Sequence, residues 1–78
     1  MKLINIGFGN LINSDKIISV ITPDSAPAKR IIADAKRDKR LIDATQGRKT
    51  ESVIITDSDH IVLSYLHNED IMQRNNED

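Results

Sequence analysis

The sequence predicts an α+β domain with a mostly antiparallel sheet and the element order β-β-α-β-β-β-α. Several short segments alternate apolar and polar residues or are rich in β-branched residues, which is typical of strands. One stretch repeats apolar residues at helical spacing, and turn-forming residues separate the segments. We expect the 78-residue chain to form a single domain over residues 1–74, followed by a polar tail over residues 75–78.

The first two strands are predicted in the N-terminal third of the chain. Ile4, Ile6 and Phe8 alternate with other residues and therefore share one face of a strand. The glycines that flank Phe8 indicate a bulge or a turn. The β-branched stretch 16–22 predicts the second strand, which Pro23 ends.

The main helix is predicted from Ala28 to about Asp38. Its apolar residues recur at i, i+3, i+4 and i+7, which is the pattern of one amphipathic stripe. Asp24 or Ser25 is suited to cap the helix. Pro27 suits the first turn, where its missing N–H group is not needed.

Three further strands and a short helix are predicted in the second half of the chain. Residues 41–45, 52–56 and 60–66 have strand patterns, and the turn signal at residues 57–59 makes the last two a hairpin. Asn68 is followed by two acidic residues, as at the start of a helix. We therefore expect a short C-terminal helix capped by Asn68.

Two of the predicted strands are apolar on both faces, at residues 17–21 and 53–55. A single solid helix covers only one face of a sheet, so we expect a second surface to be buried elsewhere. The chain has no cysteine and is short, which excludes disulfides as a source of stability. Self-association is the simplest explanation for strands that are apolar on both faces.

The net charge of −1 conceals a strong asymmetry along the chain. Residues 1–49 carry ten basic and five acidic side chains, whereas residues 50–78 carry one basic and seven acidic side chains. Such asymmetry is typical of nucleic-acid binding or of an acidic tail. On a helical wheel, the basic residues of the main helix gather on one arc: Lys29, Arg30, Lys36, Arg37 and Arg40. This stripe is either an ordinary solvated face or an auxiliary surface for phosphates.

The sequence favours neither an enzyme nor a bound metal or cofactor. No nucleophile motif surrounds any serine, and the acidic turn at Asp57 and Asp59 lacks the residues of a calcium loop. Phe8 and Tyr65 are too few to form a stacking platform for single strands, so duplex DNA is the favoured nucleic acid. No apolar stretch approaches a membrane span of ~20 residues, and we expect a cytoplasmic protein.

Four blocks of the sequence resemble one bacterial family. They are residues 5–10 (NIGFGN), 19–27 (SVITPDSAP), 41–50 (LIDATQGRKT) and 57–64 (DSDHIVLS). In this order they resemble the extracellular matrix regulatory protein RemA family, from Leu3 to about Arg74. The resemblance implies a fold similar to LytTR-type domains and a DNA-binding transcriptional regulator of matrix and biofilm genes. It also implies a ring-shaped homo-oligomer in the cytoplasm, associated with the nucleoid.

The resemblance further implies which residues contact DNA. The family's basic position before the second strand falls on Lys16, and its basic pair after the glycine falls on Arg48 and Lys49. Glu51 stands where relatives typically have arginine, and Lys39 stands where they have the glycine that ends the helix. Lys16 and Lys49 themselves replace arginine, which keeps the charge but loses the bidentate fork.

Two functions therefore remain open from the sequence. The favoured one is a ring-forming regulator in which Lys16, Arg48 and Lys49 contact the backbone of duplex DNA. The alternative is a homo-oligomeric protein-interaction or scaffold module with weak or no DNA binding. Glu51 motivates this alternative because it puts an acid beside the expected phosphate contacts.

Overall fold

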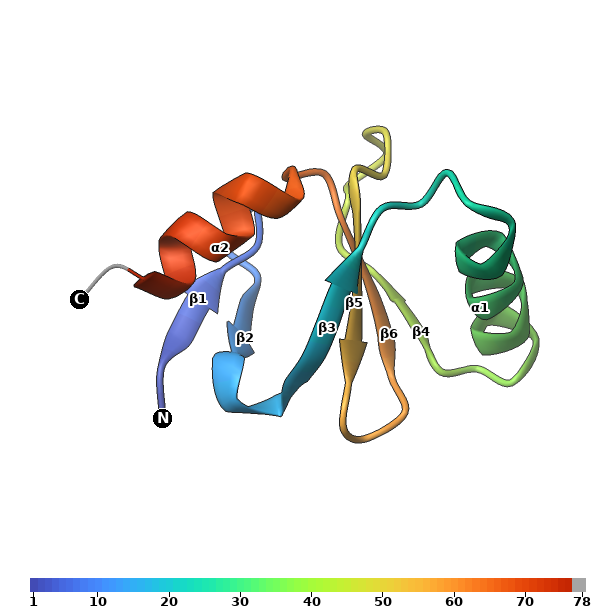
Figure 1. Cartoon of the computed structure of the whole chain (residues 1–78), viewed down its shortest axis with the longest axis horizontal. Coiled ribbons are helices and arrows are strands. Elements are labelled where there is room, and N and C mark those ends of the chain that lie inside the picture. The colour runs from blue at the N-terminus through green and yellow to red at the C-terminus, as the bar shows by residue number, and fades with distance from the viewer. Residues whose placement is uncertain (77–78) are drawn as a thin grey trace.

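The computed structural model describes residues 1–76 as two helices packed on either side of a central sheet (Figure 1). In chain order the elements are β1 (Leu3–Asn5), β2 (Leu11–Asn13), the 3-10 helix η1 (Ser14–Lys16), β3 (Ile17–Ile21), α1 (Ala26–Arg37), β4 (Leu41–Asp43), β5 (Ser52–Thr56), β6 (Ile61–Ser64) and α2 (Asn68–Asn76). The predicted α+β class is confirmed, and the predicted elements occur in the predicted order. The structure adds one strand, β2, which is too short for its sequence to show an alternating pattern.

The central sheet has four strands in the order β3-β5-β6-β4. β5 pairs antiparallel with β3 and with β6, whereas β4 pairs parallel with β6. β1 and β2 form a separate antiparallel hairpin. Most strand pairs are therefore antiparallel, as predicted, and β5 and β6 form the predicted hairpin.

The two faces of the central sheet are covered by different parts of the same chain. α1 packs on one face, and the β1–β2 hairpin and α2 lie on the other (Figure 1). Neighbouring residues of a strand point to opposite faces. Val53 therefore lies in the core beneath α1 and Ile54 in the core beneath the hairpin, and both have 0% of their surface exposed.

This arrangement corrects the expectation that the apolar stretch 53–55 needs a second copy of the chain to bury it. The hairpin and α2 cover the second face of the sheet. The sequence did not predict this cover, because only α1 has a clear helical pattern. In the other apolar stretch, 17–21, only Ile18 is exposed, at 66%. The register shift between Ile17 and Ser19 places Ile18 at an irregularity of the edge strand β3.

Local sequence signals explain both ends of α1. The Ser25 hydroxyl oxygen accepts a hydrogen bond from the Ala28 N–H group at 3.2 Å, so Ser25 rather than Asp24 is the N-cap of the two that the sequence offered. At the other end, Lys39 has a φ of 60°, and the Arg40 N–H group donates to the Ala35 carbonyl oxygen at 2.7 Å. These are features of a Schellman cap, in which glycine is usual. Lys39 occupies it at a conformational cost.

The prediction that Phe8 shares a buried face with Ile4 and Ile6 is wrong. Ile4 and Ile6 are each 3% exposed, but Phe8 is 47% exposed. The reason is that β1 ends at Asn5 and the chain then turns through Gly7, Phe8 and Gly9, which have φ angles of 120°, 57° and 79°. Alternation along the sequence cannot continue through such a turn.

Helix α2 begins one residue earlier than its predicted cap implies. Asn68 is the first helical residue, and its side-chain oxygen accepts a hydrogen bond from the Ser52 hydroxyl group at 2.7 Å. The His67 N–H group instead contacts the Asp70 carboxylate at 3.3 Å. The helix continues to Asn76 and so includes residues 75–76 of the expected tail, while residues 77–78 lie outside the described residues.

Candidate nucleic-acid interface

The basic residues predicted to contact DNA lie in three separate places on one copy of the chain. Lys16 precedes β3, and the register Ile17↔Thr56 puts it at the end of the sheet where β5 finishes. Arg48 and Lys49 lie in the loop that precedes β5, at the opposite end of the sheet (Figure 1). The structure therefore brings Arg48 and Lys49 together but does not bring Lys16 to them within one chain.

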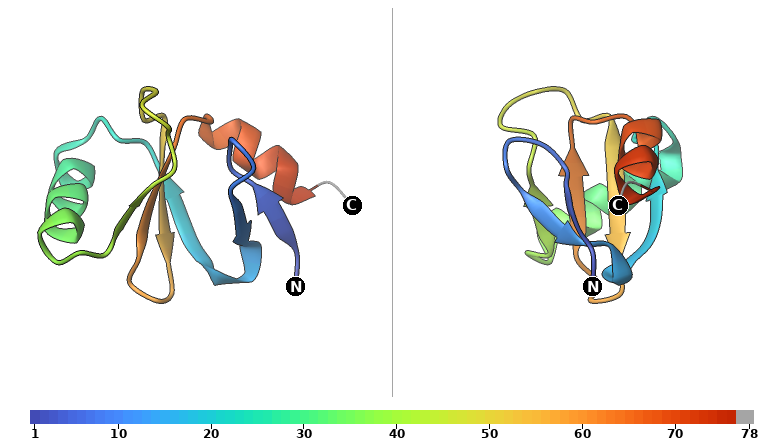
Figure 2. Two further views of the ribbon diagram at one scale, coloured as in Figure 1. Left: turned by 180° about the vertical axis from the view of Figure 1, so that it is seen from behind. Right: turned by 90° about the vertical axis from the view of Figure 1, so that its left-hand side faces the viewer.

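The basic helical residues Lys29, Arg30, Lys36 and Arg37 are exposed on α1, which forms one outer layer of the molecule (Figure 2). Arg37 pairs with Asp34 and with Asp38, in both cases at 3.3 Å. Within residues 1–76, Lys29, Arg30 and Lys36 form no ion pair. This stripe is exposed to solvent and retains part of its positive charge.

The loop of residues 44–51, which we call the basic loop, is anchored at its start by Asp43. The Asp43 carboxylate accepts hydrogen bonds from the Thr45 hydroxyl group at 2.6 Å and from the Thr45 N–H group at 3.0 Å. These two bonds lower the pKa of Asp43, because they favour the charged carboxylate. Thr45 itself is buried, so the loop leaves the sheet in a fixed direction.

The tip of the basic loop is a tight turn. The Arg48 N–H group donates to the Thr45 carbonyl oxygen at 3.0 Å, and the two residues between them, Gln46 and Gly47, have φ angles of 53° and 82°. Two successive residues with positive φ are typical of a type I′ turn. The turn exposes the side chains of Arg48 and Lys49 beyond the end of the sheet.

Arg48 contacts an aromatic ring rather than an acid. Its guanidinium carbon lies 5.7 Å from the centroid of the Tyr65 ring, which is within the range of a cation–π interaction. The Tyr65 ring in turn packs against Phe8, with 4.7 Å between the ring centroids. Within the described residues 1–76 Arg48 forms no ion pair, so its charge remains available to an anion.

Lys49 has the opposite surroundings. Its ammonium group lies 3.8 Å from one carboxylate oxygen of Glu51, and the other carboxylate oxygen lies 3.5 Å from Nδ1 of His67. Glu51 is held in place by its own N–H group, which donates to the Ser64 carbonyl oxygen at 2.9 Å. Glu51 thus offsets the charge of Lys49, although exposed pairs of this kind are individually weak.

Lys16 is paired across the end of the sheet. Its ammonium group lies 3.7 Å from the Asp57 carboxylate, and its carbonyl oxygen accepts a hydrogen bond from the Asp57 N–H group at 2.9 Å. Both side chains are largely exposed to water. The pair is therefore weak, and a phosphate can compete with Asp57 for Lys16.

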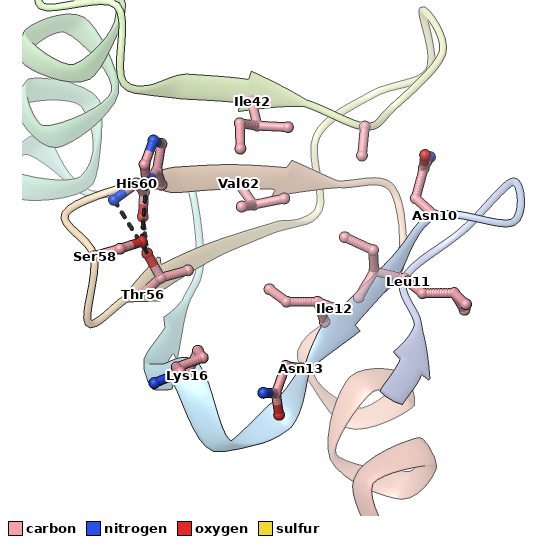
Figure 3. A pocket seen from close by; sticks show the side chains of 12 residues that line it. Asn10, Leu11, Ile12, Asn13, Lys16, Ile42, Thr56, Ser58, His60 and Val62 are labelled. Carbon is pink, nitrogen blue, oxygen red and sulfur yellow. Dashed lines mark hydrogen bonds between the residues drawn. The ribbon is translucent and has the colours of Figure 1, made fainter. Parts of the chain in front are cut away.

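Lys16 also borders a groove of about 390 Å³ between the β1–β2 hairpin and the sheet (Figure 3). Its apolar lining includes Ile12, Ile42 and Val62. At one end, the Ser58 hydroxyl group and the His60 ring are 2.9 Å apart in the turn that joins β5 to β6. Within residues 1–76 no cluster of acidic, histidine or cysteine side chains is arranged to hold a metal ion, and no helix is long and apolar enough to cross a membrane.

Two features of this interface escaped the sequence. No sequence pattern indicated that Phe8 and Tyr65 contact each other, yet their rings pack together and Tyr65 lies beside Arg48. No sequence pattern placed His67 at this interface, yet it lies against Glu51. The sequence has no signal for the first contact, because two residues that are far apart along the chain leave no local pattern when they pair.

Comparison with known proteins defines the class of the chain. A "Putative regulatory protein" of Dictyoglomus turgidum is 61% identical over 74 residues, which cover 95% of this chain and 87% of the relative. Proteins with the same name from Geobacillus thermodenitrificans and Fervidobacterium nodosum are 54% and 58% identical, over 95% and 92% of this chain and 85% and 77% of the relatives. These names support a regulatory role and indicate a regulatory protein rather than an enzyme.

The family model "Extracellular matrix regulatory protein A-like" matches residues 3–74. The chain therefore belongs to the RemA-like family, as its four sequence blocks indicated.

Proposed function

We propose that the protein is a DNA-binding transcriptional regulator that acts as a ring-shaped homo-oligomer and controls matrix or biofilm genes in the cytoplasm, at the nucleoid. The observation that carries the proposal is the basic loop, where a tight turn exposes Arg48 and Lys49 and Arg48 has no acidic partner within residues 1–76. Side chains of this kind bind the phosphates of duplex DNA. Membership of the RemA-like family supports the same role.

The separation of Lys16 from the basic loop is compatible with this function if several copies act together. One copy offers few phosphate contacts, and each is weak on its own. An assembly repeats both basic positions along one duplex, and multivalency then raises the overall affinity by orders of magnitude. The α1 stripe of Lys29, Arg30, Lys36 and Arg37 would add a second, auxiliary contact.

Exposed apolar side chains support self-association. Ile18 lies on β3 and Ile42 on β4, which are the two edge strands of the sheet, and their exposed fractions are 66% and 49%. Leu11, beside the groove, is 61% exposed. When different surfaces of identical chains meet, repeated contacts generate either a ring or an open filament.

Binding to a long duplex DNA at low and high salt tests the proposal. We expect the affinity to fall steeply as salt rises, because each phosphate contact releases counterions. Arg48→Ala combined with Lys49→Ala should weaken binding strongly. A matched control, Lys29→Ala with Lys36→Ala, removes the same charge from α1 and should weaken binding less. Affinity that is insensitive to salt, or equal for the two double variants, would contradict the assignment to the basic loop.

The second candidate function is an oligomeric protein-interaction or scaffold module with little DNA binding. The contact between Lys49 and Glu51 favours it, because the acid offsets one of the two charges of the basic loop. Light scattering with and without a long duplex separates the two functions. A stable oligomer whose mass does not change when DNA is added would favour the scaffold.

A further inference from the structure

Phe8 and Tyr65 are the only aromatic residues of the chain, and the fold stacks them on each other. Their ring centroids are 4.7 Å apart and their planes are tilted by 34°. The Tyr65 ring also lies beneath the Arg48 guanidinium group, at 5.7 Å. We call Phe8 and Tyr65 the aromatic pair. Tyr65 thus adjoins the basic residue on which the proposed function depends most, and Phe8 adjoins Tyr65.

Tyr65 is half-buried and packs against the core beneath the hairpin, but burial does not account for Phe8. Phe8 is 47% exposed and lies in neither hydrophobic core cluster, so a core role does not explain a phenyl ring at this position. Its backbone has a φ of 57°, which is unfavourable for a bulky residue. Backbone conformations of this kind persist where the surroundings enforce them, and they cluster at functional sites.

Gly7 makes room for the other ring. A Cβ atom at Gly7 would lie 2.4 Å from Cε1 of Tyr65, so the ring lies directly against bare backbone. The turn between β1 and β2 therefore does two things at once. It brings the Tyr65 ring close to the main chain and it sets Phe8 against that ring.

We propose that the aromatic pair positions Arg48 for DNA binding. Tyr65 holds the Arg48 guanidinium group through the cation–π contact, and Phe8 holds the Tyr65 ring. The inference rests on the proposed function. A ring contacts the face of the guanidinium group and leaves its N–H donors free in the plane, where a phosphate can accept from them. A stacked arginine also loses less conformational freedom when it binds than a mobile one does.

Substitution of Tyr65 tests the inference. Tyr65→Phe keeps the aromatic face and should bind a long duplex DNA like the unmodified protein. Tyr65→Leu removes the cation–π contact, and we expect the affinity to fall by about two- to five-fold for each Arg48 that touches DNA. Circular dichroism and thermal unfolding of both variants verify that they are folded.

A double-mutant cycle with Arg48→Ala separates positioning from a merely structural role. If Tyr65 acts through Arg48, Tyr65→Leu should have no further effect on affinity once Arg48 is replaced. The side-chain protons of Arg48 provide a readout without DNA. Ring-current shielding should shift their NMR signals in the unmodified protein and in Tyr65→Phe, and the shift should be lost in Tyr65→Leu.

The possible outcomes distinguish the two proposals. Salt-sensitive binding that Arg48→Ala weakens and Tyr65→Leu leaves unchanged overturns the positioning role alone. An equal loss from Tyr65→Leu in the presence and absence of Arg48 also overturns it. If the unmodified protein binds no duplex DNA at any salt concentration, the proposed function fails and this inference fails with it.

Discussion

At the scale of single residues, Glu51 is the side chain that most directly opposes the proposed DNA contact. It lies between Lys49 and His67 and is 27% exposed, less than either partner. The two cations of the basic loop, Arg48 and Lys49, therefore have different surroundings. Arg48 makes a cation–π contact with Tyr65 and has no acidic partner within residues 1–76, whereas the charge of Lys49 is partly offset by Glu51.

Replacing Glu51 by glutamine should strengthen DNA binding. The change frees Lys49 and removes a negative charge beside the phosphates, and the energy of an exposed ion pair corresponds to roughly two- to five-fold in affinity. Fluorescence anisotropy with a labelled duplex measures the effect. Glu69→Gln removes the same charge from α2 and serves as the control. An equal gain from both variants would mean that only net charge matters.

Asp43 makes the stability of the fold depend on pH. Its hydrogen bonds from Thr45 lower its pKa in the folded protein below the ordinary value, so the stabilisation is complete above about pH 4 and is lost as the pH falls through the lowered pKa. Asp43→Asn should therefore be less stable than the unmodified protein at pH 7, and the difference should shrink in acid. Urea unfolding at several pH values measures the free energies. A difference that is constant with pH would contradict this role.

Lys39 is a site where glycine should stabilise the protein. The residue has a φ of 60° in the cap that ends α1, and a non-glycine residue there costs on the order of 1 kcal/mol. Lys39→Gly should raise the free energy of unfolding by about that amount, measured in urea. Lys36→Gly, inside the same helix, should instead lower it by about 1 kcal/mol. The same sign for both variants would exclude the cap as the cause.

At the scale of elements, α2 and the β1–β2 hairpin determine whether the sheet has one covered face or two. Ile71 is the buried residue of α2 and lies in the core beneath the hairpin. The Arg74 guanidinium group also donates to the Asn5 carbonyl oxygen at 2.5 Å, which joins α2 to β1. Helix α2 thus packs on the hairpin and contributes to the core.

Truncation of Ile71 tests the contribution of α2. Ile71→Ala should lower the free energy of unfolding by about 2–5 kcal/mol, because the change leaves a cavity in the core. Met72→Ala on the next residue, which is 61% exposed, should change it by less than about 0.5 kcal/mol. Urea unfolding compares the two. Similar small effects would mean that α2 does not pack as the structure has it.

At the scale of the whole molecule, charge is segregated in space only in part, because Lys16, Arg37 and Lys49 each lie beside an acidic side chain. The basic stripe lies on α1 and the acidic residues Glu69 and Asp70 lie in the first turn of α2, on the opposite side of the sheet (Figure 1). The basic loop extends from one end of the sheet between them. The net charge of −1 is thus the sum of regions with opposite sign.

Self-association should depend on the exposed edge of the sheet. Ile18→Asp replaces the exposed apolar side chain of β3 by a charge. If this edge lies between copies, the charge would be buried without a partner, which is costly, so the mass measured by light scattering should fall. Thr22→Asp introduces the same charge at an exposed polar position just beyond that strand. An oligomer unaffected by Ile18→Asp would place the contact between copies elsewhere on the molecule.

The sequence by itself determined the features that depend on neighbouring residues. The alternating and helical patterns predicted the α+β class, the capping residues Asp24 and Ser25 indicated the start of α1 to within two residues, and the resemblance in four blocks predicted the family. These signals are local, because each depends on spacing within a few residues.

The tertiary structure decided what depends on distant residues meeting. It showed that α2 and the hairpin cover the second face of the sheet, that Lys16 lies apart from the basic loop, and that Phe8 and Tyr65 stack beside Arg48. The physical reason is that packing and Coulomb interactions depend on distance in space, and a strand order such as β3-β5-β6-β4 brings together segments that are far apart along the chain.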